Sequence, residues 1–200
     1  MASIEFFWDP VSPYTYLAST QLPTLAREAG VALVYRPFFL GGVMQTTGNR
    51  PPATVASKGR YMMADLQMWA RAYKVPLTPP ELFPAKTILA LRAGLVAEQH
   101  GDGERYAQAI MRAYWGQGRD ISDPAVVSAV LSELGLDAPA ILALTEQDTI
   151  KAALKANTEE AVARGAFGAP SLFVGEQRSG ATIGWICCGG TLTNRRPDTA

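Results

Sequence analysis

The N-terminal part of the chain contains the pattern that most constrains the fold, a strand followed by a helix and a second strand. Residues Ile4 to Trp8 form a short, aromatic-rich segment that ends at Asp9-Pro10, which predicts a strand. Ser12-Pro13 begins a helical pattern that Gly30 ends, and Val31 to Phe39 predicts the second strand. Two strands joined in this way form a parallel pair with a right-handed crossover. The sequence therefore predicts an α/β fold built on a β-α-β unit.

The middle of the chain predicts helices and no convincing strand. A polar segment rich in Gly, Pro and Asn at Gly41 to Pro52 predicts a loop. The expected helices are Ala53 to Tyr73, Lys86 to Gln99, Glu104 to Trp115, Asp123 to Leu134, Ala138 to Leu144 and Thr149 to Arg164. An apolar strand at Ser171 to Val174 follows. We expect one domain formed by residues 1–52 and 166–200, with residues 53–165 as an inserted helical subdomain.

Composition excludes several classes of protein. A chain of 200 residues suits one domain, or one domain with an insertion. Its 18 Lys and Arg balance its 18 Asp and Glu without a basic block, so nucleic acid and anionic membranes are not expected partners. No apolar run is long enough to span a bilayer, and the start has no positively charged leader, which predicts a cytoplasmic protein. The adjacent Cys187 and Cys188 and the single His100 predict neither a disulfide nor a metal site.

The segment Ser12-Pro13-Tyr14-Thr15 lies where the first expected strand meets the first expected helix. A helix N-terminus offers unpaired N–H groups and a partial positive charge, which stabilise an anion such as a thiolate. A serine hydroxyl is a poor nucleophile without a base, but it donates well to a bound thiolate. Ser12 is therefore a candidate site residue, and a plain helix N-cap is the alternative.

A second motif, Gly168-Ala169-Pro170, precedes the last expected strand. It predicts either an ordinary turn with a trans peptide bond or a cis-proline. A cis-proline here would turn the Ala169 backbone toward a ligand, where its N–H and C=O could pair with an extended peptide.

Together these motifs resemble a known family. The β-α-β start, the helical insert and G-A-P before the third strand are similar to the thioredoxin fold of the DsbA type, with Ser12 to Thr15 in place of C-x-x-C. The run D-x-x-S-P-Y-x-Y-L-A from Asp9 resembles the kappa-class glutathione transferases, and among them the bacterial 2-hydroxychromene-2-carboxylate isomerases. Further matching motifs occur in order at Gly41 to Pro52, Asp65 to Ala70, Tyr114 to Asp123 and Gly168 to Gly175.

The resemblance implies glutathione as the cofactor, bound where the first helix begins. Ser12 would donate a hydrogen bond to the glutathione sulfur and, with Pro13 and Tyr14 at the helix start, keep it as a thiolate. The backbone of Ala169, ahead of a cis-Pro170, would pair with the cysteinyl main chain of the tripeptide.

Other residues would complete the site. Asn49 would reach it from its loop and Lys58 could meet a carboxylate, while a turn residue and a solvated helix face are the alternatives. The pocket for an aromatic substrate would be lined by Asn49, Phe83, Pro84 and Trp115. Core packing is the expectation for Trp69. The resemblance also implies a homodimer that acts on a small aromatic substrate.

Three functions follow from these observations. The first is a glutathione-dependent isomerase that converts 2-hydroxychromene-2-carboxylate to trans-o-hydroxybenzylidenepyruvate in aromatic catabolism. The second is a kappa-like glutathione transferase that conjugates electrophiles. The third, from a different class, is a non-catalytic thioredoxin-fold protein that holds an extended peptide at the cis-proline.

The sequence changes character after Gln177. The last stretch, RSGATIGWICCGGTLTNRRPDTA, has no periodicity and contains both cysteines. In one possible coding sequence, a single T inserted after the codon for Arg178 turns the residues that follow into FWGNDRLDLLRR. This resembles F-x-G-N-D-R-L, the next element of the family, whose Asn-Asp pair helps to hold the γ-glutamyl group. We expect a frameshift here, loss of the hairpin partner of the Ser171 to Val174 strand, poor order from Ser179 to Ala200, and impaired activity.

Overall fold

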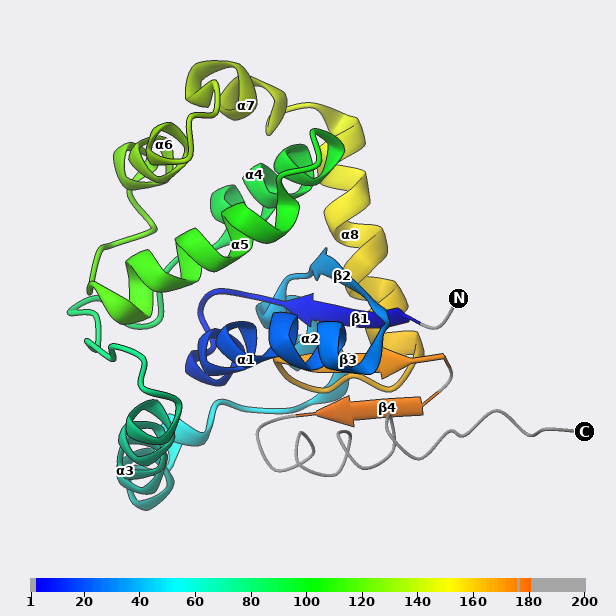
Figure 1. Cartoon of the computed structure of the whole chain (residues 1–200). Helices are drawn as coiled ribbons and strands as arrows, with labels where there is room; N and C mark the ends of the chain where they lie inside the picture. The colour runs from blue at the N-terminus through cyan, green and yellow to red at the C-terminus, as the bar shows by residue number, and fades with distance from the viewer. Residues whose placement is uncertain (1–2, 176, 181–200) are drawn as a thin grey trace, which may run out of the picture.

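The computed structural model describes residues 3–175 and 177–180, with side chains described up to residue 175. A four-stranded sheet with the order β2-β1-β3-β4 forms its centre (Figure 1). The strands are β1 (Ser3–Trp8), β2 (Ala32–Pro37), β3 (Ser171–Val174) and β4 (Gln177–Gly180). Strand β2 pairs parallel to β1 and β3 pairs antiparallel to β1, while α1 (Pro13–Ala29) connects β1 to β2. The predicted β-α-β start and α/β class are confirmed.

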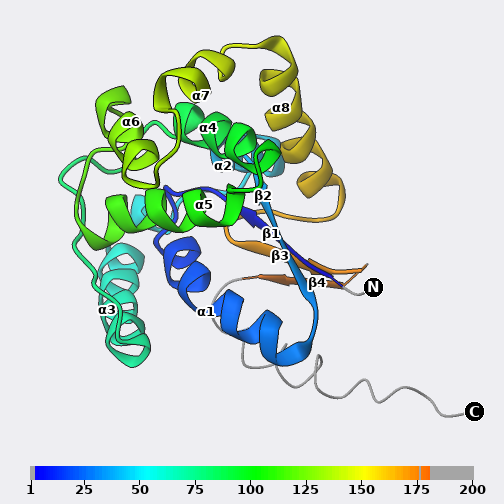
Figure 2. The same cartoon turned by 45° about the horizontal axis from the view of Figure 1, so that its top comes forward.

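Most of the remaining described chain is helical. The elements after β2 are α2 (Leu40–Thr47), the 3₁₀ turn η1 (Pro52–Thr54), α3 (Ala56–Tyr73), α4 (Ile88–Gln99), α5 (Gly103–Met111), the π-helical turn η2 (Arg112–Gly116), α6 (Pro124–Glu133), α7 (Ala138–Leu144) and α8 (Asp148–Ala163). Figures 1 and 2 show α4 to α7 gathered on one side of the sheet, whereas α3 stands at one end beside α1. None of the helices in the described part of the chain has the length and apolar character that crossing a bilayer requires.

The division into a 1–52 and 166–200 domain and a 53–165 insert stays a prediction. Helix α8, which this division assigns to the insert, contacts both β2 and α2. The backbone N–H of Phe39 donates to Thr158 Oγ1 on α8 at 3.0 Å. The end of the predicted insert therefore packs directly on the sheet side of the molecule.

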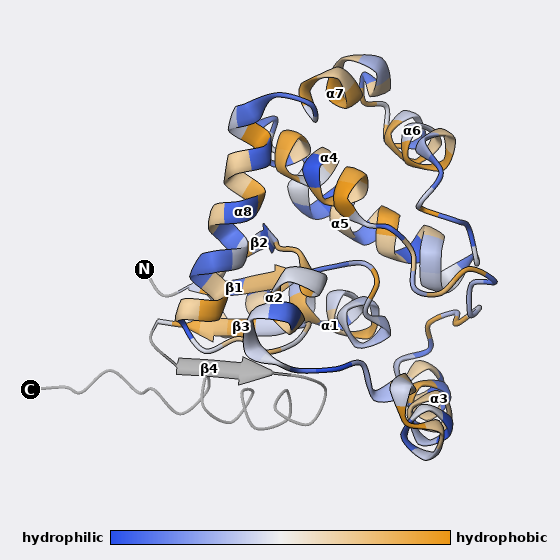
Figure 3. Cartoon of the chain, turned by 180° about the vertical axis from the view of Figure 1, so that it is seen from behind, coloured by the Kyte–Doolittle hydropathy of each residue, from blue (hydrophilic) through white to orange (hydrophobic). Residues whose placement is uncertain are grey.

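Alternating side chains of β1 build the core on both faces of the sheet. Ile4, Phe6 and Trp8 belong to a large cluster with the helices, and Phe7 points to the other face. There the Phe7 ring meets the Phe173 ring edge-on at 5.4 Å between centroids. Figure 3 shows hydrophobic residues concentrated on β1 and β3. Burial of both faces explains why β1 carries large apolar side chains on both of its sides.

The prediction of a loop at Gly41 to Pro52 is wrong for its first half, which forms α2. The N-cap residue of α2, Phe39, has a side chain that forms no capping hydrogen bond. The Leu40 N–H instead donates to the carboxylate of Asp9 at 2.9 Å. A Cβ at position 41 would lie 2.6 Å from the Phe39 ring, so glycine lets that ring pack on the helix. The Asp9 contact is tertiary, and local sequence patterns do not contain it.

Two other boundaries differ from expectation. The helix predicted from Glu104 to Trp115 ends at Met111 and continues as the η2 turn. The helix predicted from Ala53 begins at Ala56, after η1. At Met111 the chain keeps helical character but changes its winding, whereas extended Val55 separates η1 from α3.

The expected loss of a hairpin partner for β3 is also corrected. Residues 177–180 form β4, antiparallel to β3, in the chain as it stands, so Ser179 and Gly180 belong to the sheet. The rest of the segment expected to be poorly ordered, and the closing helix of the restored frame, lie outside the described residues. The frameshift itself stays a prediction.

Candidate active site

Ser12 lies at the start of α1, where its side chain has two roles. The residue has extended backbone dihedrals, and its Oγ accepts a hydrogen bond from the Thr15 N–H at 3.3 Å, so it is the N-cap of the helix. Its hydroxyl also donates to the carbonyl oxygen of Ala169 at 2.9 Å. The two motifs singled out in the sequence therefore meet, although they are 157 residues apart.

The Ala169–Pro170 peptide bond is cis, as the functional interpretation of this motif predicted. The loop before it is held by Asn49, whose side-chain amide donates to the carbonyl oxygen of Phe167 at 2.7 Å. Among the described residues, no partner accepts the N–H of Ala169. That N–H lies next to Ser12 and is available to a ligand with an acceptor, such as a peptide carbonyl.

The structure places Tyr14 and Lys58 on one pocket of about 370 Å³. This pocket lies between the start of α1 and the start of α3 and is lined by Tyr14, Pro52, Ser57, Lys58, Tyr61 and Met62. The Tyr14 hydroxyl donates to Asp65 on α3 at 2.7 Å, which fixes the wall of the pocket. Lys58 makes no ion pair with another described residue, so its ammonium group can meet a ligand carboxylate.

The predicted aromatic pocket is only partly formed. Trp115 is 2% exposed, and its indole N–H donates to the carbonyl oxygen of Pro10 at 2.8 Å. It therefore supports the loop that leads to Ser12 instead of presenting an open ring face. Phe83 is 41% exposed and contacts the edge of Trp115 at 5.6 Å between centroids, and exposed Pro84 follows it. Of these aromatic rings, Phe83 is the one accessible to a substrate.

With this geometry described, comparison with known proteins decides the family. The chain matches the DsbA-like thioredoxin domain over residues 3–185. The chain belongs to the DsbA-like thioredoxin family. Replacement of C-x-x-C by Ser12-Pro13-Tyr14-Thr15 means that this DsbA-like domain lacks the cysteine pair at the helix start.

The relatives of this DsbA-like domain are isomerases and glutathione transferases, which confirms the predicted resemblance. It is 34% identical to the 2-hydroxychromene-2-carboxylate isomerase of Sphingobium xenophagum, with 88% of this chain and 90% of the relative covered. It is also 34% identical to glutathione S-transferase kappa 1 of Caenorhabditis elegans, covering 84% of this chain and 78% of the relative. A solved 2-hydroxychromene-2-carboxylate isomerase has the same fold, with a TM-score of 0.88, 23% identity and coverage of 96% and 94%.

Asp9 is a residue at this site that the sequence reasoning missed. It is fully buried three residues before Ser12, and burial raises the pKa of its carboxyl group to about 6. Hydrogen bonds from Val11, Leu40 and Thr87 oppose that rise. The signal was present in the sequence as the Asp-Pro pair at the end of an apolar strand, but that pair also ends ordinary strands.

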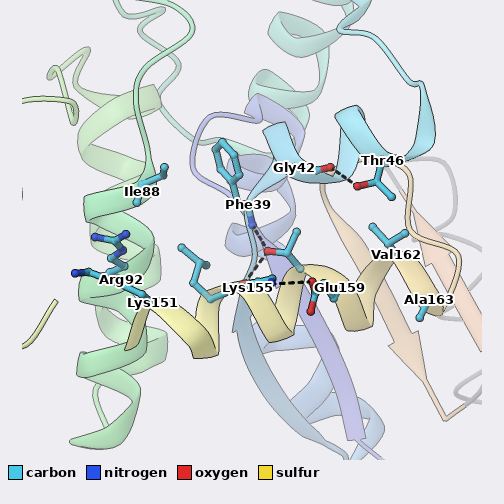
Figure 4. Close-up of a pocket in the computed structure, with 12 residues that line it drawn as sticks. Phe39, Gly42, Thr46, Ile88, Arg92, Lys151, Lys155, Glu159, Val162 and Ala163 are labelled. Carbon is cyan, nitrogen blue, oxygen red and sulfur yellow. Dashed lines mark hydrogen bonds and ion pairs between the residues drawn. The ribbon is translucent and has the colours of Figure 1, made fainter. Parts of the chain in front are cut away.

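A larger groove, of about 480 Å³, lies between α2, α4 and α8 (Figure 4). None of the predicted site residues lines it. Its basic side chains are paired with neighbouring acids, for example Arg92 with Glu146 at 3.2 Å and Lys155 with Glu159 at 3.7 Å. The groove therefore has little free positive charge.

Proposed function

We propose that this protein is a glutathione-dependent isomerase that converts 2-hydroxychromene-2-carboxylate to trans-o-hydroxybenzylidenepyruvate in aromatic catabolism. The observation that carries the proposal is the contact between Ser12 Oγ and the carbonyl oxygen of Ala169, at the N-terminus of α1 and beside cis-Pro170. A relative named for this isomerase, 34% identical over most of both chains, supports the choice of reaction.

The residues present fit the central cysteine of glutathione and one of its terminal carboxylates. The free N–H of Ala169 suits the cysteinyl carbonyl, and Ser12 with the first-turn N–H groups of α1 suits the sulfur. Lys58, on the pocket next to Tyr14, suits a carboxylate. Peptide binding in extended form beside a cis-proline uses the same kind of backbone pairing as an added β-strand.

Glutathione supplies a thiol that can add reversibly to the conjugated substrate, which allows rotation about a carbon–carbon bond before the thiol leaves. The protein contributes a hydrogen-bond donor and a helix N-terminus where negative charge is stabilised. When the ligand binds, the Ser12 hydroxyl would turn its one proton from the Ala169 carbonyl oxygen to the sulfur and thereby favour the ionised thiol. Phe83, half exposed beside Trp115, would contact the aromatic ring of the substrate.

The alternative enzyme is a kappa-like transferase, favoured by the 34% identity to the Caenorhabditis elegans kappa transferase. Conversion of 2-hydroxychromene-2-carboxylate is followed by absorbance and is compared with conjugation of glutathione to chlorodinitrobenzene. We expect the first activity to exceed the second. The reverse result would favour the transferase.

A peptide-binding protein without catalysis is the remaining alternative. Calorimetric titration with glutathione and with S-methylglutathione separates it from the enzymes. We expect both compounds to bind and glutathione alone to support isomerisation, because the methylated sulfur cannot add to the substrate. If neither glutathione nor S-methylglutathione binds, both the isomerase and the transferase are excluded. The predicted homodimer is measured in the same samples by light scattering.

A further inference from the structure

The carboxylate of Asp9 connects three segments around the candidate site. Its Oδ1 accepts a hydrogen bond from the Val11 N–H at 3.0 Å, and its Oδ2 accepts from the Leu40 N–H at 2.9 Å and the Thr87 hydroxyl at 3.2 Å. The side chain is completely buried, and no Lys, Arg or His within the described residues forms an ion pair with it. All of its partners are therefore neutral donors, two of them backbone groups.

One of these segments carries Ser12. The Ser12 N–H donates to the Asp9 carbonyl oxygen at 3.2 Å, so the backbone and the carboxylate of Asp9 both shape the turn before α1. The Trp115 indole binds the Pro10 carbonyl oxygen within the same turn. The position of the Ser12 hydroxyl thus depends on a turn that Asp9 closes.

The second segment leads to Asn49. Leu40 is the first residue of α2, and the Asp9 carboxylate replaces the missing side-chain cap at the N-terminus of this helix. Helix α2 ends at Thr47 with Gly48 as its C-cap, and Asn49 then binds the carbonyl oxygen of Phe167 in the loop before cis-Pro170. Ser12 and Asn49 therefore approach the same loop from two segments that share one carboxylate.

We propose that Asp9 is a positioning residue of the glutathione site, whose ionised carboxylate holds the Ser12 turn and the start of α2 in the geometry that binds the tripeptide. This inference rests on the proposed function and extends it to a residue that does not touch the ligand. Protonation removes the charge that strengthens these three hydrogen bonds, and it adds a proton that the Thr87 hydroxyl can accept but the Val11 and Leu40 N–H groups cannot. Glutathione affinity then falls as Asp9 becomes protonated.

The cost of the buried charge supports a functional reason for its presence. A carboxylate without a counter-ion in the interior is expensive, and it is found most often at functional sites. Burial raises the pKa of Asp9 to about 6, so protonation occurs near neutral pH. The titratable group that faces it is Tyr114 of η2, whose own pKa rises to about 12, mainly through burial. The other elements present Thr87 and the N–H groups of Val11 and Leu40.

The test measures the affinity for S-methylglutathione between about pH 5 and pH 8. This probe has no thiol, so ionisation of the sulfur does not contribute to the result. We expect the affinity of the native chain to fall about tenfold on the acid side, the effect of one charge-assisted hydrogen bond. Asp9→Asn should give the low affinity at every pH. The proposal would be overturned if the native chain bound S-methylglutathione equally well at every pH in this range. It would also be overturned if Asp9→Asn bound the probe as tightly as the native chain does.

Thr87→Val separates positioning from a general effect on folding. Loss of the Thr87 donor raises the pKa of Asp9, so the acid fall in affinity should move to higher pH without a change in the affinity at the alkaline limit. If the Thr87–Asp9 bond were merely structural, Thr87→Val would lower the free energy of unfolding and leave the pH midpoint of the affinity unchanged. That result would contradict the proposal. Asp148→Asn, at a fully exposed carboxylate, controls for net charge.

A titration without ligand distinguishes failure of this inference from failure of the proposed function. The amide signals of Ser12 and Asn49 in heteronuclear NMR spectra should shift with the same midpoint as those of Val11 and Leu40. They should cease to do so in Asp9→Asn. If S-methylglutathione never binds but these amides still titrate together, the proposed function fails and the positioning by Asp9 stands. If the Ser12 and Asn49 amides do not follow Asp9, the positioning role is refuted whatever the ligand result.

Discussion

The Tyr14 hydroxyl donates a 2.7 Å hydrogen bond to the Asp65 carboxylate and so ties the start of α1 to the middle of α3. Helix α3 buries only Leu66 and Ala70 completely, and its other apolar contacts with the core come from partly buried Met62, Met63, Trp69 and Tyr73. The same helix carries Lys58, which lines the pocket beside Tyr14. Burial and the Asp65 contact raise the pKa of Tyr14, which keeps its proton in this bond throughout the neutral range.

Removal of this bond should loosen α3. We expect Tyr14→Phe to lower the free energy of unfolding by about 1 kcal/mol, the usual net contribution of one hydrogen bond, and to weaken glutathione binding. Urea unfolding and calorimetry measure the two effects. Tyr73→Phe is the matched control, because the Tyr73 hydroxyl has no hydrogen-bond partner among the described residues. Equal losses in both variants would show that the Tyr14–Asp65 bond is not responsible.

The Ser12 hydroxyl should determine the ionisation of a bound thiol. We expect Ser12→Ala to raise the pKa of the glutathione thiol in the complex and to reduce turnover about tenfold to hundredfold, because a hydrogen bond to a charged group contributes about 1.5–3 kcal/mol. Thiolate absorbance in the ultraviolet, followed against pH, measures the change. Ser19→Ala is a suitable control, since Ser19 is buried in the same helix and binds only the Tyr16 carbonyl. An unchanged thiol pKa in Ser12→Ala would refute the proposed role.

Asp9 should also shape the dependence of stability on pH. Its pKa is raised from 3.8 to about 6 in the folded chain, so folding favours the protonated form. The stability that protonated Asp9 contributes to the folded chain is fully present below about pH 4 and is lost as pH rises through about 6. Relative to Asp9→Asn, the native chain should lose about 3 kcal/mol of unfolding free energy between about pH 3.5 and pH 7. Urea titrations at several pH values test this, and a constant difference between the two proteins would contradict it.

Glu5 should produce the opposite slope. Hydrogen bonding to Arg164 holds its pKa below the ordinary 4.5, with Arg36 contributing and burial opposing. The stability that the Glu5–Arg164 ion pair contributes is present above pH 4.5 and is lost as pH falls through the lowered pKa of Glu5. Glu5→Gln should therefore melt at a lower temperature than the native chain at pH 7, and this gap should narrow in acid. A gap that stays constant down to about pH 3 would argue against the assignment.

The coding DNA offers a test of the altered C-terminal sequence. We expect a homologous locus, or a corrected read of this one, to contain one additional T after the codon for Arg178, so that the reading continues as F-W-G-N-D-R-L. The chain with that continuation should bind glutathione more tightly than the chain as written, because the Asn-Asp pair would be restored. Resequencing that finds the present frame with codons that cannot yield this reading would remove the hypothesis.

Local sequence determined the elements whose stabilising contacts are close along the chain. The β1-α1-β2 order follows from an apolar run, a Ser-Pro helix start and a glycine at the helix end, and all three are short-range features. Asp123 and Asp137 cap α6 and α7 at the predicted places, through bonds to Ala125 and Ala140. The cis-proline interpretation of Ala169-Pro170 was open in the sequence, and the structure decided it.

Tertiary structure decided what depends on partners far apart in the chain. Helix α2 was predicted as a loop because its cap comes from Asp9, 31 residues away, and no local pattern records such a cap. The same reason hid Asp9 as a site residue and turned Trp115 from a predicted pocket wall into a support for Pro10. The sequence alone placed Ser12 at a helix start and Ala169 before a strand. Only the folded sheet brings the two within 2.9 Å, because β3 lies beside β1 and carries the loop to the start of α1.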